Sequence, residues 1–256
     1  MSNIDSNSIK NVYSKVILKE GKYYHDVLSP AFWKDGKFDP DTRQKLLTIA
    51  LDFYDHLKLP APIIDIQLTG SLANYNYTPL SDLDVHIIID FTRINNDKEL
   101  VKKAVDGMRF IWNARHNIVI NGHDVEIYIQ DAVEQHISSG LFSLKNDKWI
   151  KEPKVATPEI DDRDVERKFT AYVNEIDKMD ELLKRKRLSR DEYRAIESRA
   201  ARLKEKIARD RNESLRQKGE YSVENLVFKK LRNSDHLEKL INVISTAYDS
   251  LFSDRK

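Results

Sequence analysis

The stretch Leu68–Asp90 reads LTGSLANYNYTPLSDLDVHIIID, and the rest of the chain can be interpreted outward from it. It opens near Gly70-Ser71, and Asp82-Leu83-Asp84 follows just before the mostly apolar run Val85–Ile89. Residues two apart on a strand share a face, so Asp82 and Asp84 are expected side by side. Two carboxylates on one face repel each other unless a cation lies between them. Hard oxygen ligands of this kind suit Mg²⁺ or Mn²⁺.

The segments on either side of Gly70-Ser71 predict a strand, a turn and a second strand. We expect the strands at Ile63–Leu68 and Leu83–Phe91, with one helical turn at Leu72–Tyr75. Backbone N–H groups at such a turn form a cradle for phosphate, and the Ser71 hydroxyl can add a donor. The plainer alternative is an ordinary strand-to-helix turn. His86 falls on the carboxylate face, where it could hydrogen-bond an aspartate or touch substrate, and we favour the alternative of a histidine partly buried beside the site.

A second acidic strand follows the dipeptide Asn121-Gly122, which is the strongest short signal for a hairpin. It predicts strands at Ile118–Ile120 and Asp124–Ile129, with Asp124, Glu126 and Tyr128 on one face. Glu126, between Val125 and Ile127, is the preferred third carboxylate. Asp124 is its rival, and the alternative for Asp124 is a solvated residue after the turn.

These motifs together resemble the active-site signature of the polymerase beta-like nucleotidyltransferase superfamily. That signature is Gly-Ser, a spacer, Asp-x-Asp between hydrophobic residues, and a third carboxylate on a later strand. The resemblance covers roughly residues 62–130, and the whole chain also looks like predicted nucleotidyltransferases of tailed phages. It implies an α+β fold, with a nucleotidyltransferase-type mixed sheet and flanking helices. It also implies catalytic, metal-binding roles for Asp82, Asp84 and Glu126, and nucleotide binding at Gly70 and Ser71.

The activity implied by the resemblance is transfer of a nucleoside monophosphate from a nucleoside triphosphate such as ATP to an acceptor hydroxyl. Two Mg²⁺ or Mn²⁺ ions would assist, and pyrophosphate would leave. An RNA 3′ end, a protein hydroxyl and a small molecule all stay open as acceptors. A non-catalytic nucleotide-binding module is a second hypothesis. A metal-dependent hydrolase or glycosyltransferase using Asp-x-Asp is a third, but it leaves Gly70-Ser71 unexplained.

A triphosphate also needs cationic side chains, and Lys145 and Lys148 are the candidates near the expected rim of the site. The alternative for both lysines is a solvated loop. His136, Ser138 and Ser139 fall in the same region.

Composition narrows the class of protein. The chain has 256 residues, with 43 basic and 42 acidic side chains, so overall charge neither demands nor excludes nucleic acid. The absence of cysteine excludes disulfides, zinc–thiolate sites and thiol catalysis. No apolar run reaches membrane-spanning length, and the first thirty residues lack the order of a signal peptide. We expect a soluble, cytoplasmic protein.

The sequence favours two domains, residues 1–152 and residues 153–256. In the first, a short helix is expected at Ile9–Leu18, a longer one after the cap Asp39, and another at Asp97–His116. In that last helix Leu100, Val101, Ala104, Met108 and Ile111-Trp112 are expected to face inward.

The second domain is expected to be helical. Two amphipathic helices, joined by the basic turn Lys184–Arg187, should pack as an antiparallel hairpin, with two more helices at Ser222–Leu231 and Asp235–Phe252. Residues 163–220 hold 18 basic and 13 acidic side chains. This bias leans slightly towards RNA, and an ion-paired, solvated hairpin explains it equally well.

Overall fold

The computed structural model describes residues 24–136, 138–185 and 188–253. Of these, residues 24–157 form one compact unit and residues 158–253 the other. The division lies between Thr157 and Pro158, whereas the sequence favours one at 152/153. The helix expected at Ile9–Leu18 lies outside the described residues, as do Lys186 and Arg187 of the basic turn.

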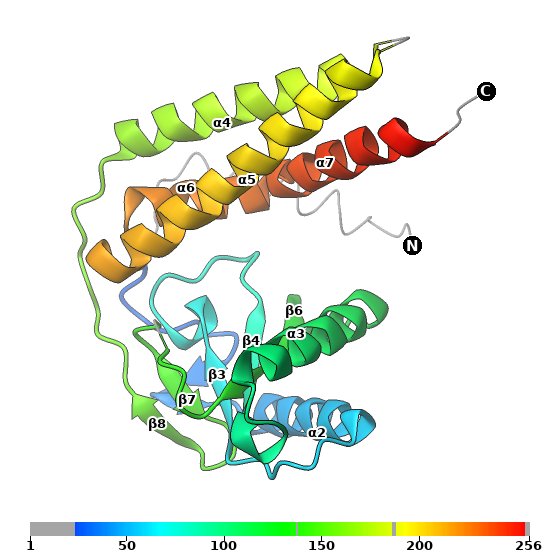
Figure 1. Cartoon of the computed structure of the whole chain (residues 1–256). Helices are drawn as coiled ribbons and strands as arrows, with labels where there is room; N and C mark the ends of the chain where they lie inside the picture. The colour runs from blue at the N-terminus through cyan, green and yellow to red at the C-terminus, as the bar shows by residue number, and fades with distance from the viewer. Residues whose placement is uncertain (1–23, 137, 186–187, 254–256) are drawn as a thin grey trace, which may run out of the picture. The chain divides into compact units, whose positions relative to one another are not determined.

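The first unit is an α+β structure built on a mixed six-stranded sheet (Figure 1). The strand order is β5-β6-β4-β3-β7-β8. Strand β4 pairs antiparallel with β3 and parallel with β6, and the remaining pairs are antiparallel. The bounds are β3 Asp65–Thr69, β4 Leu83–Ile89, β5 Val119–Ile120, β6 His123–Asp131, β7 Leu141–Ser143 and β8 Lys148–Lys151; a separate two-stranded ribbon joins β1 Trp33–Lys34 to β2 Lys37–Phe38.

Alternation along the three central strands separates an apolar face from a polar one. Apolar residues lie opposite one another across the pairs, as Leu68 does with Val85, and Val85 with Ile127. These side chains are almost completely buried and pack with Leu46 and Phe53 of α2. The other face carries the acidic and aromatic polar residues of the same strands. The polar face is therefore a consequence of register, because a shift of one residue would put the carboxylates into the core.

The hairpin expected at Asn121-Gly122 is present. Both residues have positive φ, 51° and 84°, which is the backbone that a two-residue turn of this class requires. Strands β5 and β6 pair on either side of it, with Ile120 opposite His123.

Two long helices accompany the sheet, α2 Pro40–Leu57 and α3 Lys98–Arg115. Asp39 and Asp97 cap them, each with a carboxylate that accepts a backbone N–H of the first turn. Short 3₁₀ turns lie at η1 Ser71–Ala73 and η2 Phe91–Arg93, so the helical turn expected at Leu72–Tyr75 is shorter and begins earlier.

The inward face expected for α3 is partly wrong. Val101 and Val105 are buried, whereas Leu100, Met108 and Ile111 are 57%, 40% and 51% exposed. The helix carries apolar residues around more than one face, so sequence spacing alone does not select the buried stripe. Packing against β6 selects the stripe that contains Val105.

The second unit consists of α4 Asp162–Leu183, α5 Arg190–Lys218, α6 Val223–Asn233 and α7 His236–Phe252 (Figure 1). Helices α4 and α5 contact each other, as the hairpin expected from the sequence requires, but this contact is the smaller part of their packing. Helix α5 packs chiefly against α7, and α4 packs against α6 and α7. The reason is that the apolar stripe of α7, with Leu240 and Val243, is buried between them and takes up their apolar faces.

Within the described ranges, no helix combines the length and the apolar character needed to cross a membrane.

The cap of α2 generates a stability prediction. The Thr42 N–H donates to Asp39 at 2.9 Å, and this hydrogen bond holds the pKa of the Asp39 carboxyl below its ordinary value. Asp39→Ala should lower the free energy of unfolding by about 1 kcal/mol at neutral pH, measured by urea denaturation. Because the folded pKa is depressed, this contribution is lost as pH falls from about 3.8 through the folded pKa.

Asp41→Ala, which removes a first-turn charge but no cap, is the matched control and should cost less. Equal losses in the two variants, or a difference that persists in strong acid, would contradict the capping role.

Candidate functional site

The candidate site lies on the polar face of β3, β4 and β6. In the observed register Asp84 pairs with Glu126 on one side and with Thr69 on the other. Paired residues of neighbouring strands have side chains on the same face and a few ångströms apart. Two of the three expected carboxylates are therefore adjacent. Asp82 lies just before the first residue of β4 and is half-buried.

Asp124, the rival of Glu126, occupies a different position. It pairs with Val119 of the short strand β5, at the hairpin end of β6. The residue of β4 that pairs with Val125 is Leu83, so Asp124 falls level with Asp82 rather than Asp84. Glu126 is thus the carboxylate of β6 that adjoins the Asp84 side chain.

The Gly70 turn closes against Asp84. Gly70 has φ 73° and ψ −160°, a conformation open essentially to glycine alone. A Cβ atom built on Gly70 would lie 1.9 Å from the Asp84 Oδ2 atom. The glycine is therefore required by its backbone angles and by the carboxylate that packs on it. From the sequence, the only reason expected for a glycine at position 70 is the close approach of phosphate to the backbone. The structure adds a second reason, the packing of the Asp84 carboxylate.

Ser71 serves the turn in a way that the sequence does not predict. Its hydroxyl donates to the Ser81 Oγ atom at 2.7 Å, and Ser81 Oγ accepts the Thr78 N–H at 2.9 Å. These bonds tie the Gly70 turn to the loop that leads into Asp82. The Ser71 proton is committed to Ser81, so its oxygen is left to accept a hydrogen bond.

Tyr128 holds Glu126 in place. The Tyr128 hydroxyl donates to the Glu126 Oε2 atom, and the ring stacks on His86 at 4.7 Å. The guanidinium of Arg109 covers the same ring, 4.6 Å from its centroid. Burial, followed by the negative charges of Asp84 and Glu126, raises the pKa of Tyr128 well above its ordinary value. The hydroxyl therefore stays protonated and keeps donating.

His86 is a partly buried member of this face, as the sequence favours. Gln130 Nε2 donates to the Glu134 carbonyl, so its Oε1 atom faces His86 Nδ1 at 2.8 Å and accepts the ring proton. Burial lowers the pKa of His86 to about 4 and outweighs the hydrogen bond to Gln130, and the nearby Arg109 guanidinium acts in the same direction as burial. A neutral imidazole adds no charge beside the carboxylates.

Three buried polar atoms around the His86–Tyr128 pair have no hydrogen-bond partner among the described residues. They are Gln67 Oε1, Arg109 Nε and His136 Nε2. Gln67 pairs with His86 across the strands, and the His136 ring lies 5.1 Å from the His86 ring. Buried polar groups are normally hydrogen-bonded to protein or to water, so each of these atoms can bond a water molecule or a ligand that reaches this face.

The loop before β7 forms one rim of the site. Ser139 Oγ accepts a hydrogen bond from Asn74 at 2.7 Å, and Gly140 packs so tightly on Ala73 that a Cβ would lie 1.8 Å from its carbonyl oxygen. The expectation that residues of this loop lie near the Gly70 turn is met at Ser139.

The structure does not bring Lys145 or Lys148 to this rim. The Lys145 ammonium donates to the carbonyls of Ile63 and Ile64, at the opposite end of β3 from Gly70 and about 20 Å away along the strand. Lys148 begins the edge strand β8, three strand spacings or about 14 Å from β4. Sequence proximity suggested the rim, but the β7–β8 hairpin directs both lysines elsewhere.

The carboxylates have the right chemistry for a hard divalent cation. In residues 24–136, 138–185 and 188–253, no three His, Asp or Glu side chains converge into a ready-made metal cage. Mg²⁺ characteristically uses one or two carboxylates and completes its octahedron with water and substrate phosphates. The adjacent pair Asp84 and Glu126 fits that requirement.

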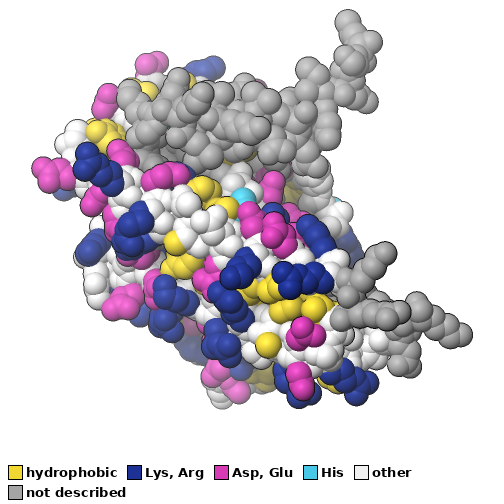
Figure 2. Space-filling model, turned by 90° about the horizontal axis from the view of Figure 1, so that it is seen from above, with side chains coloured by type: hydrophobic (Ala, Val, Ile, Leu, Met, Phe, Trp, Pro, Cys, Tyr) yellow, Lys and Arg dark blue, Asp and Glu magenta, His cyan; other side chains and the backbone are white. Residues whose placement is uncertain are grey.

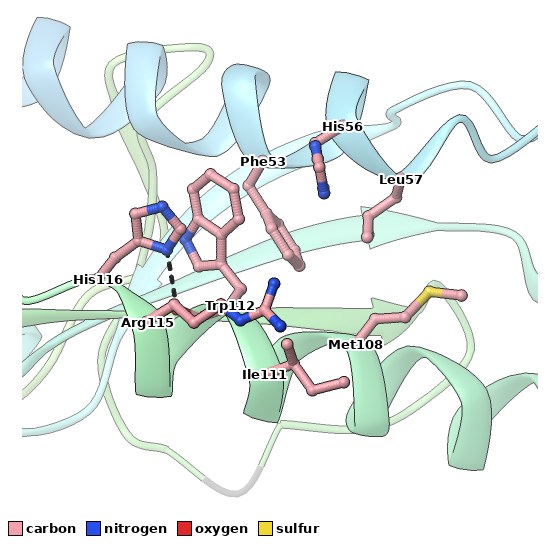
Figure 3. A pocket seen from close by; sticks show the side chains of 8 residues that line it. All are labelled: Phe53, His56, Leu57, Met108, Ile111, Trp112, Arg115 and His116. Carbon is pink, nitrogen blue, oxygen red and sulfur yellow. Dashed lines mark hydrogen bonds between the residues drawn. The ribbon is translucent and has the colours of Figure 1, made fainter.

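A separate hollow lies between α2 and α3, lined by Phe53 and Trp112 among other apolar side chains (Figure 3). Its volume is about 530 Å³. Met108 and Ile111, which the sequence places in the core, also line this hollow. None of the three expected carboxylates lines it.

No protein-family model, no curated protein and no solved structure matches this chain.

The contact between Gly70 and Asp84 can be tested with a matched pair of glycines. Gly219, at the end of α5, has nearly the same backbone, φ 76° and ψ −165°, but a Cβ added there would meet no atom of the described residues within 4 Å. Gly219→Ala should cost about 1–3 kcal/mol from backbone strain. Gly70→Ala should cost about 1–3 kcal/mol more in thermal or urea unfolding, because the methyl group displaces the carboxylate.

Adding Asp84→Ala to Gly70→Ala should recover most of that excess. Equal costs at the two glycines, or no recovery in the double variant, would contradict the packing of Gly70 on Asp84.

Proposed function

We propose that the chain is a metal-dependent nucleotidyltransferase that moves a nucleoside monophosphate from a nucleoside triphosphate to an acceptor hydroxyl. One observation carries the proposal: Asp84 and Glu126 are paired on neighbouring parallel strands, and the Gly70 backbone packs directly on the Asp84 carboxylate. A glycine turn, an Asp-x-Asp strand and a third carboxylate are the parts that this chemistry needs. The α+β architecture with a mixed sheet is compatible with it.

The Gly70-Ser71 turn supplies the binding site for phosphate in this proposal. Without a side chain, Gly70 lets phosphate oxygens approach the backbone closely, and N–H groups of the turn can donate to them. The Ser71–Ser81 hydrogen bond fixes the turn relative to Asp82. Because the turn and Asp84 are in contact, phosphate and carboxylates are held at a set separation.

Asp82, Asp84 and Glu126 would hold Mg²⁺ or Mn²⁺, which when bound offsets the charge of the triphosphate and the leaving pyrophosphate. The protein's own contribution is position. Register fixes Asp84 beside Glu126, and Tyr128 restrains one oxygen of Glu126. Restraint of this kind matters because such transfers depend on in-line placement of the reacting groups.

The chemical step needs one proton acceptor. The oxygen of the acceptor hydroxyl forms a bond to the α-phosphorus, while the bond from that phosphorus to the bridging oxygen breaks. The electron pair leaves with pyrophosphate, and the hydroxyl proton passes to the free carboxylate oxygen of Glu126. Tyr128 donates to the other oxygen, Oε2, which keeps a second lone pair with which Glu126 would hold the metal ion.

An RNA 3′ end is the first acceptor to test, with protein and small-molecule hydroxyls as alternatives. The basic excess of the helical unit gives RNA only slight support, because many of those cations are paired. Examples are Arg199 with Glu175 at 2.9 Å and Lys184 with Asp180 at 2.6 Å. On the face drawn in Figure 2, basic and acidic side chains are intermixed.

The function is tested by incubating the protein with each α-labelled nucleoside triphosphate, Mg²⁺ or Mn²⁺, and total RNA or total protein. Label in RNA or in protein identifies the acceptor class. Tight nucleotide binding without pyrophosphate release in any mixture would instead favour a non-catalytic nucleotide-binding module. Hydrolysis to free monophosphate alone would favour a hydrolase.

The choice between Glu126 and Asp124 gives a sharper prediction. Glu126→Gln should lower the transfer rate by at least about 10²-fold while nucleotide binding persists, because the proton acceptor is lost. Asp84→Asn should abolish transfer and weaken binding of the metal–nucleotide complex. Asp124→Asn is the matched control on the same strand face, and it should retain activity within about threefold.

Full activity in Glu126→Gln together with loss in Asp124→Asn would reverse the assignment. Near-normal turnover in Asp84→Asn would remove the basis of the proposed function.

A further inference from the structure

The hollow between α2 and α3 has the character of a small-molecule site. Its volume of about 530 Å³ is in the range of ligand pockets, and its walls are mainly apolar. Phe53 forms the floor and is fully buried, while Met108 and Ile111 line one side with half-exposed side chains. Neighbouring exposed apolar side chains that line a hollow form the kind of surface on which a ligand's apolar body can pack.

Trp112 is the fixed wall of this pocket. Its ring contacts Phe53 at 5.1 Å and His56 at 5.8 Å, and it stacks on His116 at 3.8 Å between ring centroids. His116 is itself held, because its Nδ1 atom donates to the Trp112 carbonyl at 2.9 Å. An aromatic wall restrained on three sides can receive a flat or aliphatic ligand body with little loss of side-chain entropy.

The polar groups of the pocket are all basic or neutral. His56, Arg115 and His116 contribute nitrogen donors, and no Asp or Glu of the described residues lines the pocket. Figure 3 shows the Arg115 guanidinium between the two helices, among the apolar side chains. Within the part of the chain that the structure describes, Arg115 makes no side-chain hydrogen bond or ion pair, whereas Lys103 on the same helix is paired with Glu99 at 2.8 Å.

A guanidinium that makes no hydrogen bond or ion pair within the described residues, next to an apolar wall, favours a particular class of ligand. Its planar set of N–H donors matches a carboxylate in a two-point contact, and the apolar wall matches a hydrocarbon or aromatic body. We propose that this pocket binds a small amphipathic carboxylate, an apolar chain or ring that ends in one anionic group. The carboxylate would lie on Arg115, and the body would lie between Trp112, Met108 and Ile111. This site is independent of the proposed transferase chemistry.

The test uses 4-phenylbutyrate, with 4-phenylbutanol as the neutral analogue and 4-phenylbutylamine as the cationic one. Binding is followed by the indole N–H signals of the three tryptophans in heteronuclear NMR spectra. Trp33 and Trp149, stacked on each other at 4.6 Å and outside the pocket, are internal controls. The carboxylate should shift the Trp112 signal saturably, about tenfold more tightly than the alcohol, and the amine should bind more weakly still.

Two variants assign the preference to Arg115. Arg115→Gln should reduce affinity for the carboxylate to that for the alcohol and leave alcohol binding unchanged, while Lys103→Gln should change neither. Both positions are exposed, so the fold should be retained. Equal affinity for the three compounds in the native protein would overturn the proposal. So would a shift of Trp33 and Trp149 instead of Trp112, or concentration-dependent self-association as the only change at Trp112.

Discussion

The register between β4 and its two neighbours is the constraint on which the first unit depends. Asp84 lies opposite Thr69 in β3 and beside Glu126 in β6, while Val85 lies opposite Leu68 and beside Ile127. Strand alternation has a period of two, so the buried apolar face and the polar face are set by the same pairing. A slip of one residue in β6 would bury Glu126 and expose Ile127. The hydrophobic energy that holds the sheet therefore also fixes the carboxylates.

This coupling explains the less favourable features of the polar face. The Gly70 backbone adopts a conformation restricted to glycine in order to pack on Asp84, and two carboxylates lie next to each other. Around them, Gln67, Arg109 and His136 each have a buried polar atom without a hydrogen-bond partner among the described residues. Backbone strain of the kind seen at Gly70 is concentrated at functional sites, where the surrounding core compensates for it.

Local signals allowed much of the fold to be predicted from the sequence. The Asp39 cap, the Asn121-Gly122 turn and the alternation around Asp84 are each determined by residues within a few positions of one another. Alternation places Glu126 and Asp84 each on the polar face of its strand, and their pairing depends in addition on β6 lying beside β4. Packing between residues that are far apart in the chain could not be predicted from these local signals. The β7–β8 hairpin directs Lys145 away from the Gly70 turn, and nothing in the sequence near that lysine encodes this.

The prediction of helix packing was partly wrong for a related reason. Whether Met108 is buried depends on how α3 lies against β6 and α2. In the second unit α5 packs chiefly on α7, from which α6 separates it in the chain, rather than on the adjacent helix α4.

The most direct test of the central claim is to locate bound Mn²⁺ in the presence of a non-hydrolysable nucleoside triphosphate analogue, by paramagnetic broadening of backbone amide signals. The proposed function predicts that the amides of Gly70, Asp84 and Glu126 broaden at the lowest Mn²⁺ concentration, before those of Lys145 and Lys148 and before the Trp112 indole. Broadening centred at Lys145, or none that depends on the nucleotide analogue, would contradict the assignment of this sheet face as the site of metal and nucleotide.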